Sequence, residues 1–255
     1  MLGLPDGVTA CLFDMDGVVT KTAVVHAAAW KDMFDEFLRD WSSKTGTAFV
    51  PFDKARDYEE YVDGKPRLQG TKSFLESRSI SLPEGSPSDP AGAQTEWGLS
   101  NRKNELVQKV LERDGVEVYD GSVRYITAVR AAGLRTAIVS SSANTVAVLE
   151  AAGITDLFDT RVDAQVAGER GLRGKPAPDT FLEAARMLGV GAKQAAVFED
   201  ALAGVAAGHA GGFGLVVGVD RVGQAEALRA HGADIVVQDL AELLNQDGQP
   251  GQGAR

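Results

Sequence analysis

The chain has 255 residues, of which 44% are hydrophobic and 24% charged, and its formal net charge is −10. This profile is typical of a globular protein with one large domain or two smaller ones. The negative charge and the lack of clustered Lys and Arg exclude a nucleic-acid partner, because binding a polyanion requires such clusters. No stretch approaches the roughly 18 to 20 apolar residues of a membrane helix, and the first residues lack a signal peptide. We therefore expect a cytoplasmic protein with no membrane partner.

Two carboxylates follow the end of the first predicted strand. An apolar run over residues 10–13 is followed by Asp14 and, one residue further on, Asp16. Two ionised carboxylates this close repel each other at neutral pH unless a cation or a shared proton lies between them. The pattern therefore suggests a metal. Cys11, the single cysteine, lies inside the same apolar run and is expected to be an inert buried thiol.

A helical block follows this strand. Residues 24–41 repeat apolar side chains at helical spacings, so these side chains share one face. The sequence then stays mostly helical, with one break at residues 64–66 and an uncommonly long loop at residues 82–98. A last helix is expected over residues 101–114, where Gly115 stops it.

From residue 116 onward, helices alternate with short apolar strands. Strands of this kind, buried on both faces and separated by helices, predict an α/β fold with a doubly wound, Rossmann-like parallel sheet. The pattern predicts helices at residues 122–132, 179–188 and 202–210, another ending near residue 153, and strands at residues 134–139, 195–198, 214–219 and 234–237.

The helical block interrupts the predicted sheet after its first strand. We therefore predict an α/β core domain from residues 1–20 and 116–245, and an inserted α-helical cap domain from residues 21–115. The tail at residues 246–255 is rich in Gly and Gln, and we expect it to be disordered.

Polar side chains follow several predicted strands. In an open parallel sheet, ligands bind beyond the carboxyl ends of the strands, so these side chains are expected to meet at one edge. The groups are Asp14 and Asp16 after the first strand, Ser140 to Ser142 with Asn144 after the second, Glu199 and Asp200 after a later one, and Lys175 before a helix.

Together these motifs resemble the haloacid-dehalogenase superfamily of phosphotransferases, and most closely its β-phosphoglucomutase group. The superfamily pattern is an apolar strand with D-x-D-G-x-x-T, a strand ending in Ser or Thr, a Lys before a helix, and an acidic pair after another strand. The chain has all four in this order, at residues 13–20, 139–140, 174–179 and 198–204. The resemblance covers roughly residues 8–240.

The acidic residues suit phosphoryl transfer. Asp14 would attack phosphorus as a nucleophile and form an aspartyl-phosphate. Asp16 would serve as general acid and then general base at the bridging oxygen. Mg²⁺ prefers hard oxygen ligands, so Asp14, the backbone carbonyl of Asp16 and Asp200 are its expected ligands, with Glu199 in support. The metal would offset the repulsion between these acids and the incoming phosphate.

The other core motifs supply partners for the phosphoryl group. Ser140 would donate a hydrogen bond to a phosphoryl oxygen, and Lys175 would neutralise charge on the same group in the transition state. The helix start from Ser142 to Asn144 offers backbone amides to an anion. The expected partner is a small phosphorylated sugar.

Two cap residues match the β-phosphoglucomutase group. His26 lies on the apolar face of the first inserted helix, and the resemblance implies that it couples the cap to acid–base chemistry; a packed core histidine is the alternative. Arg67 matches a cap arginine that contacts the second phosphate of the substrate. Arginine suits bidentate phosphate binding, although a solvated surface residue is the alternative.

The cap departs from the group's pattern at several positions. Asp63 stands where the group has a lysine, and Lys65 follows two residues later. Ala143 replaces the lysine that accompanies the serine-rich loop, and Lys21 stands where aspartate is common. The loop around residues 83–98 is longer than in the compact form of the cap.

The resemblance implies a monomeric, Mg²⁺-dependent mutase that interconverts β-D-glucose 1-phosphate and D-glucose 6-phosphate. Cations of the cap, among them the segment at residues 102–104, favour this activity because a mutase must hold a second phosphate. A sugar-phosphate phosphatase would use the same intermediate, and the core motifs do not distinguish the two. A receiver-like phospho-switch domain is a third reading, which the helical insert and the chain length disfavour.

Overall fold

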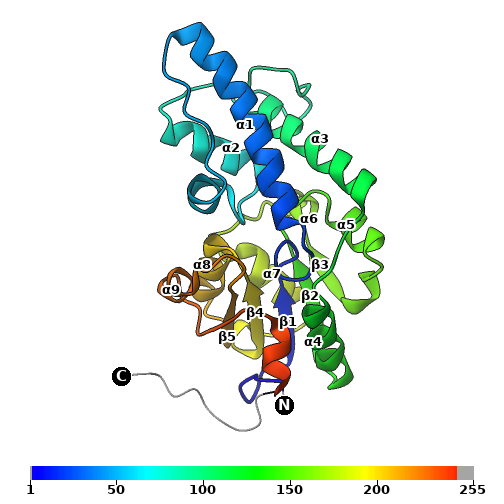
Figure 1. Cartoon of the computed structure of the whole chain (residues 1–255). Helices are drawn as coiled ribbons and strands as arrows, with labels where there is room; N and C mark the ends of the chain where they lie inside the picture. The colour runs from blue at the N-terminus through cyan, green and yellow to red at the C-terminus, as the bar shows by residue number, and fades with distance from the viewer. Residues whose placement is uncertain (1, 246–255) are drawn as a thin grey trace.

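The computed structural model describes residues 2–245, so the tail that we expected to be disordered lies outside the described part. Its centre is one sheet of six parallel strands in the order β3-β2-β1-β4-β5-β6 (Figure 1). The doubly wound parallel α/β sheet is therefore confirmed. The strands are β1 (Ala10–Phe13), β2 (Arg135–Val139), β3 (Thr160–Val162), β4 (Ala195–Glu199), β5 (Leu215–Val219) and β6 (Ile235–Val237).

Helices cover both faces of the sheet because successive strand residues point to opposite faces. Cys11 and Phe13 of β1 belong to one buried cluster, while Ala10 and Leu12 belong to another. The first cluster also takes in side chains of α4, and the second takes in side chains of α7 and α8. The helices of this part are α4 (Asp120–Ala131), α5 (Thr145–Ala151), α6 (Ala164–Glu169), α7 (Asp179–Met187), α8 (Leu202–Ala210) and α9 (Ala225–Ala230).

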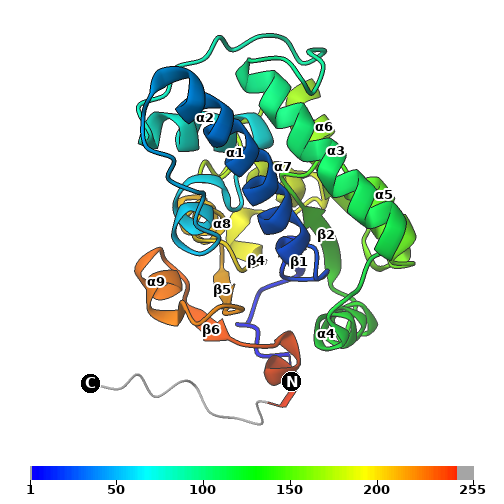
Figure 2. The ribbon, with the colours of Figure 1, turned by 45° about the horizontal axis from the view of Figure 1, so that its top comes forward.

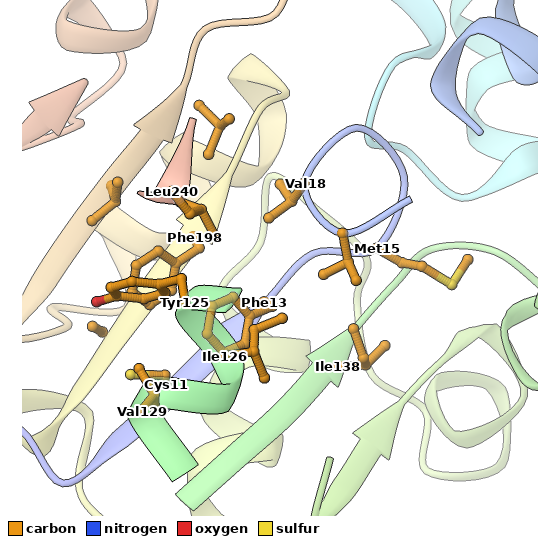
Figure 3. Packing of buried hydrophobic residues seen from close by; sticks show 14 of the residues in the cluster. Cys11, Phe13, Met15, Val18, Tyr125, Ile126, Val129, Ile138, Phe198 and Leu240 are labelled. Carbon is orange, nitrogen blue, oxygen red and sulfur yellow. The ribbon is translucent and has the colours of Figure 1, made fainter. Parts of the chain in front are cut away.

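The rings of Phe13, Tyr125 and Phe198 pack together within the first cluster, as Figure 3 shows. The rings of Phe13 and Phe198 stack with centroids 4.5 Å apart, and Tyr125 meets Phe13 edge-on at 6.4 Å. Cys11 is buried beside them, and burial raises the pKa of its thiol well above the usual range. The predicted buried cysteine is thus confirmed.

The segment between β1 and α4 forms its own helical layer above the carboxyl ends of the strands (Figures 1 and 2). Its elements are α1 (Ala23–Thr45), a π-helical turn η1 (Tyr58–Val62), α2 (Arg67–Ser77) and α3 (Glu96–Asp114). They share a separate buried cluster in which Trp30 and Phe74 each lie near Phe34. This separate core supports the division into a core of residues 1–20 and 116–245 and a cap of residues 21–115, which we keep as a proposal.

The two connections between the cap and the core run side by side. Lys21 N–H donates to Glu117 O at 2.8 Å, and Tyr119 N–H donates to Val19 O at 2.9 Å. Thr20 also pairs with Val118 as an isolated antiparallel bridge. The chain thus enters and leaves the cap at one point, immediately after the Asp14–Gly17 segment.

Some element boundaries differ from the sequence expectations. Helix α3 begins at Glu96 rather than at residue 101, because the hydroxyl of Thr95 accepts a hydrogen bond from Gly98 N–H at 2.9 Å and caps the helix. Residues 46–53 are irregular, whereas we expected a mostly helical segment there. The strand β3, with three residues, and the short α6 and α9 were not predicted at all.

None of the helices within residues 2–245 combines the length and the apolar character that crossing a membrane requires.

Candidate active site

A cavity of about 470 Å³ lies between the strand ends and the cap. Segments that follow β1, β2 and β4 line its core side, and α1, η1, α2 and α3 line its cap side. Of the residues that the sequence singles out, the cavity wall contains Asp14, Asp16, Ser142, Asn144 and Asp200 from the core and His26 and Arg67 from the cap.

Lys175 organises the core side from beneath the cavity. Its side chain is 1% exposed, and its ammonium lies 2.5 Å from Asp14 Oδ1 and 2.5 Å from Glu199 Oε1. It also donates to the carbonyl oxygen of Val139 at 3.1 Å. Burial lowers the pKa of Lys175, but the two carboxylates outweigh this effect, so the pKa is raised overall and the ammonium stays charged. Lys175, which precedes α7, thus holds together Asp14 after β1, Val139 at the end of β2 and Glu199 at the end of β4.

The carboxylates of this side outnumber its cation. Asp14, Glu199 and Asp200 are buried, and each offers an oxygen within 4.8 Å of the others. Burial raises the pKa of Asp14 well above its usual range, although Lys175 opposes the shift. Burial, and then the nearby Asp63 and Glu199, likewise raise the pKa of Asp200. The cluster therefore has a surplus of negative charge.

A divalent cation fits this donor set. Three hard carboxylate oxygens close together are the ligands that Mg²⁺ accepts, and its charge would favour the ionised forms of Asp14 and Asp200. Both oxygens of Glu199 already have partners, since Lys175 binds Oε1 and Ala201 N–H donates to Oε2 at 2.8 Å. Glu199 therefore suits a supporting position better than that of a primary ligand.

The turn after β1 is shaped to bring backbone close to Asp200. Gly17 has φ +90°, and a Cβ at this position would overlap the carboxylate of Asp200. Only glycine combines this φ with such a close approach. The guanidinium of Arg221 donates to Gly17 O at 2.7 Å and stacks 3.5 Å from the ring centroid of Tyr119. The turn that carries Asp16 is therefore fixed from two sides.

Asp16 lies next to the cap residue His26. The hydroxyl of Thr22 donates to Asp16 Oδ1, and His26 Nε2 lies 3.5 Å from the same oxygen. On the other side of the ring, Lys103 Nζ lies 2.6 Å from His26 Nδ1. A lysine ammonium can only donate, so Nδ1 is the acceptor and Nε2 carries the proton that faces Asp16. His26 thus connects a cap lysine to the expected acid–base residue.

Burial lowers the pKa values of both His26 and Lys103. It lowers the pKa of His26 to about 4, and the neighbouring charge of Lys103 adds to the effect. It also lowers the pKa of Lys103 to about 7, with Asp16 opposing and Arg67 reinforcing the shift. His26 is therefore neutral near neutral pH, whereas Lys103 titrates there.

In the serine-rich segment after β2, Ser140 bonds within the segment itself, whereas the residues after it line the cavity or contact the cap. Ser140 is 3% exposed, and its hydroxyl accepts a hydrogen bond from Ser142 N–H at 3.1 Å. It does not belong to the cavity wall, whereas Ser141 and Ser142 do. Ser141 donates to Gly64 O of the cap at 2.8 Å. Asn144 donates to Asn104 Oδ1 at 3.0 Å, so its side chain is engaged by the cap.

Several cavity residues escaped the sequence analysis. Asp63, noted there only as a departure, lines the cavity, and burial together with Glu199 raises its pKa to about 7, partly offset by the Tyr58 hydroxyl. Trp97 lines the cavity from the first turn of α3. The segment 102–104 divides, because Lys103 and Asn104 line the cavity while Arg102 pairs with Glu36. Only the register of α3 reveals this division.

Comparison with known proteins identifies the family. The family model described as haloacid dehalogenase-like hydrolase matches residues 8–212. The chain belongs to this family. The resemblance carried by the four motifs is thereby confirmed, and the family match spans all of them.

Individual relatives within the haloacid dehalogenase-like family carry more specific names. The β-phosphoglucomutases of Mycobacterium tuberculosis and Mycobacterium bovis are each 58% identical to this chain over 247 residues, which are 96% of this chain and 94% of theirs. The β-phosphoglucomutase of Bacillus subtilis is 32% identical over 92% of this chain and 91% of its own. The crystal structure of β-phosphoglucomutase from Clostridium difficile has a TM-score of 0.72 and 26% identity over 92% of this chain and 93% of that one.

Proposed function

We propose that the chain is a Mg²⁺-dependent phosphomutase that interconverts β-D-glucose 1-phosphate and D-glucose 6-phosphate. The observation that carries this proposal is the 58% identity with curated β-phosphoglucomutases over almost the whole of both chains. The cluster of Asp14, Lys175, Glu199 and Asp200 supports the chemistry, because a buried ammonium contacts two carboxylates and three carboxylates lie within 4.8 Å of one another.

Asp14 is the proposed nucleophile. One of its carboxylate oxygens attacks phosphorus of the donor, forms a P–O bond and displaces the sugar oxygen, which gives an aspartyl-phosphate. The Lys175 ammonium, 2.5 Å from Oδ1, stays in place and balances the charge of the transferred group. Bound Mg²⁺, held by Asp14, Asp200 and the backbone carbonyl of Asp16 with Glu199 in support, would supply the remaining positive charge. Ser140 is proposed to donate to a phosphoryl oxygen once its hydroxyl turns from Ser142.

Asp16 is the proposed general acid and base. It donates a proton to the departing sugar oxygen when Asp14 is phosphorylated, and it accepts a proton from the sugar hydroxyl that attacks the phospho-Asp14. The Thr22 hydroxyl donates to its carboxylate, and His26 Nε2, which has no hydrogen-bond partner within residues 2–245, lies 3.5 Å from the same oxygen. We propose that His26 is a positioning residue, because its lowered pKa leaves it neutral during this exchange.

The cap side of the cavity is proposed to bind the second phosphate of the sugar bisphosphate. Phospho-Asp14 first phosphorylates the sugar, and the bisphosphate then turns round so that its other phosphate reaches Asp14. Arg67 of the cap, together with Ser142 and Asn144 from the facing edge of the core, would hold the phosphate that is not reacting. The side chain of Asn144 must exchange its contact with Asn104 for a contact with the ligand.

A sugar-phosphate phosphatase is the second candidate function. It would use the same phospho-Asp14 but would transfer the group to water, so the core side of the cavity fits both activities. The closed arrangement of the cap, with Ser141 bound to Gly64 and Asn144 bound to Asn104, favours the mutase because it restricts access of water to Asp14. A receiver-like switch domain is disfavoured by the mutase relatives, which match along almost the entire chain.

One assay separates the two enzymes. The chain is incubated with Mg²⁺, β-glucose 1-phosphate and a trace of glucose 1,6-bisphosphate, and glucose 6-phosphate and free phosphate are measured together. The mutase forms glucose 6-phosphate with little free phosphate. Stoichiometric release of phosphate without glucose 6-phosphate would assign the chain as a phosphatase. A cytoplasmic location and a monomeric state remain predictions, which fractionation of cells and light scattering would test.

A further inference from the structure

The irregular segment at residues 83–95, here called the 83–95 loop, connects α2 to α3 at the far edge of the cap (Figure 2). Most of its side chains are exposed, yet its backbone is tied at both ends. Glu96 N–H donates to Pro83 O at 3.0 Å, and Trp97 N–H donates to Glu84 O at 3.1 Å. Inside the loop, Thr95 Oγ1 donates to Asp89 Oδ2 at 2.6 Å. The loop therefore has a defined shape rather than hanging freely from the cap.

Asn101, on the second turn of α3, connects this loop to Arg67. Its side-chain amide donates to Pro87 O at 3.1 Å and to Asp89 O at 2.8 Å. These two bonds use the NH₂ group, so the amide carbonyl is left facing the opposite way. There, Asn101 Oδ1 accepts a hydrogen bond from Arg67 Nη2 at 3.2 Å. The loop thus fixes the orientation of the amide, and the amide in turn holds one arm of the guanidinium.

Arg67 is otherwise poorly satisfied. Among residues 2–245, no hydrogen-bond partner reaches its buried Nε, and no carboxylate forms an ion pair with its guanidinium. Arg67 is part of the cavity wall, and burial lowers the pKa of its guanidinium. A guanidinium with these unpaired donors is suited to bind an anion, because a phosphate would supply the hydrogen-bond acceptors that the protein does not.

We propose that Asn101 is a positioning residue that transmits the shape of the 83–95 loop to Arg67 and thereby sets the affinity of the cap for the second phosphate. The identity of this anion rests on the proposed function, whereas the contacts from the loop to the guanidinium do not. The 83–95 loop is then part of the substrate-recognition apparatus, although no residue between 83 and 95 lines the cavity.

The test compares two reactions of the same protein with Mg²⁺ present. Turnover of β-glucose 1-phosphate requires binding of a second phosphate, whereas hydrolysis of acetyl phosphate requires only Asp14 and its neighbours. Asn101→Ala is expected to raise KM for β-glucose 1-phosphate about tenfold, the typical loss for a hydrogen bond to a charged group. Hydrolysis of acetyl phosphate is expected to change less than about twofold. Ser43→Ala, which removes an exposed cap hydroxyl that donates to Asp40 O on α1, away from the 83–95 loop and the cavity, is the control and should change neither reaction.

A double-mutant cycle shows whether Asn101 acts through Arg67. In an Arg67→Ala background, Asn101→Ala is expected to have no further effect on KM. Asn101→Asp keeps the size of the side chain but replaces the NH₂ group by an oxygen, which cannot donate to Pro87 O or Asp89 O and which pairs with the guanidinium directly. It should raise KM at least as much as alanine does, and it serves as the second variant if Asn101→Ala folds poorly.

Three outcomes would overturn the proposal: an unchanged KM in both Asn101 variants, a parallel loss of acetyl phosphate hydrolysis, or an equal effect of Asn101→Ala with and without Arg67. The proposed function is tested separately by the product. If the wild-type protein released only free phosphate, the mutase proposal would fail, but the affinity for glucose 1,6-bisphosphate, compared between the wild type and the Asn101 and Arg67 variants, would still test Asn101.

Discussion

The two sides of the cavity carry opposite charge and differ in how that charge is held. On the core side, the carboxylates of Asp14 and Glu199 bind the ammonium of Lys175 directly, and each group lies at a strand end or beside one. On the cap side, Lys103 contacts a neutral imidazole and Arg67 contacts a neutral amide. The core cation Lys175 is therefore paired with two carboxylates, whereas the cap cations Lys103 and Arg67 have neutral hydrogen-bond partners.

This difference suits the two sides to different functions, the reaction on the core side and substrate binding on the cap side. The paired core side is suited to repeat the same phosphoryl transfer with any donor that reaches Asp14. The unpaired cap side is suited to bind an anion, because its cations gain most from a partner that the protein does not provide. The core therefore determines the reaction, and the cap determines which substrate and which acceptor take part in it.

The largest expected effect lies on the core side. Asp14→Asn removes the nucleophile while it keeps the shape of the side chain, so turnover should fall by roughly 10⁴- to 10⁶-fold. Incubation of the wild-type protein with acetyl phosphate should add the mass of one phosphoryl group, and the variant should show no such gain by mass spectrometry. A variant that retained turnover or acquired the phosphoryl group would place the nucleophile elsewhere.

The second effect concerns stability. Lys175→Met leaves Asp14 and Glu199 buried without their cation, and loss of one partner of a buried ion pair typically costs about 3 to 5 kcal/mol. Urea unfolding near pH 7 without Mg²⁺ should show this decrease, while Lys193→Met, at an exposed position, should change little.

The dependence of this effect on pH has a definite sign. The folded-state pKa of Asp14 is raised, so its destabilising contribution appears as pH rises above about 4, where the unfolded carboxyl ionises. The deficit of Lys175→Met should therefore be smaller near pH 4 than near pH 7. Equal stability of the variant and the wild type near pH 7 would contradict the claim that Lys175 stabilises the buried carboxylates of Asp14 and Glu199.

The third effect lies on the cap side. Arg67→Ala is expected to raise KM for β-glucose 1-phosphate about 10- to 100-fold, because hydrogen bonds to charged groups contribute about 1.5 to 3 kcal/mol. Acetyl phosphate hydrolysis should be unaffected, and steady-state kinetics with both substrates measure the contrast. Equal losses with both substrates would show that Arg67 supports the reaction itself and that the two sides are not separate.

The smallest effect is a pH dependence specific to the cap. The pKa of Lys103 is lowered to about 7, so its charge is present below this pH and is lost as pH rises through it. The ratio of kcat/KM between wild type and Lys103→Met should therefore be greatest below pH 7 and decline at higher pH, by up to about tenfold. The ratio cancels titration of the substrate phosphate, which is the same for both proteins. A ratio that does not vary with pH would contradict this account.

The same division explains what could be predicted from the sequence. Asp14 and Asp200 follow apolar strands, and the rule that strand ends of a parallel sheet meet at one edge suffices to bring them together, whereas Lys175 was recognised from its place before a helix. The strand β3 escaped prediction because three residues carry too little periodicity. The family resemblance added the roles of these residues, which spacing alone does not provide.

The cap residues follow no comparable rule. Lys103 reaches the cavity while Arg102 pairs with Glu36, because adjacent residues of a helix point about 100° apart and the packing of α3 decides which side faces the cavity. Asn101 gains its position from a loop that the sequence marks only as long and polar. The family resemblance singled out Arg67, which lines the cavity, but the amino-acid pattern did not reveal which cation of residues 102–104 does so.

The claim that the core transfers a phosphoryl group and the cap directs it to a sugar can be tested in a single turnover. The protein is first phosphorylated with acetyl phosphate, freed of excess donor, and mixed with Mg²⁺ and β-glucose 1-phosphate, and the phosphoryl group is then located. We predict that it appears mainly on the sugar, as glucose 1,6-bisphosphate and glucose 6-phosphate, and that Arg67→Ala increases the fraction lost to water. Transfer to water at the same rate with and without sugar would contradict the central claim.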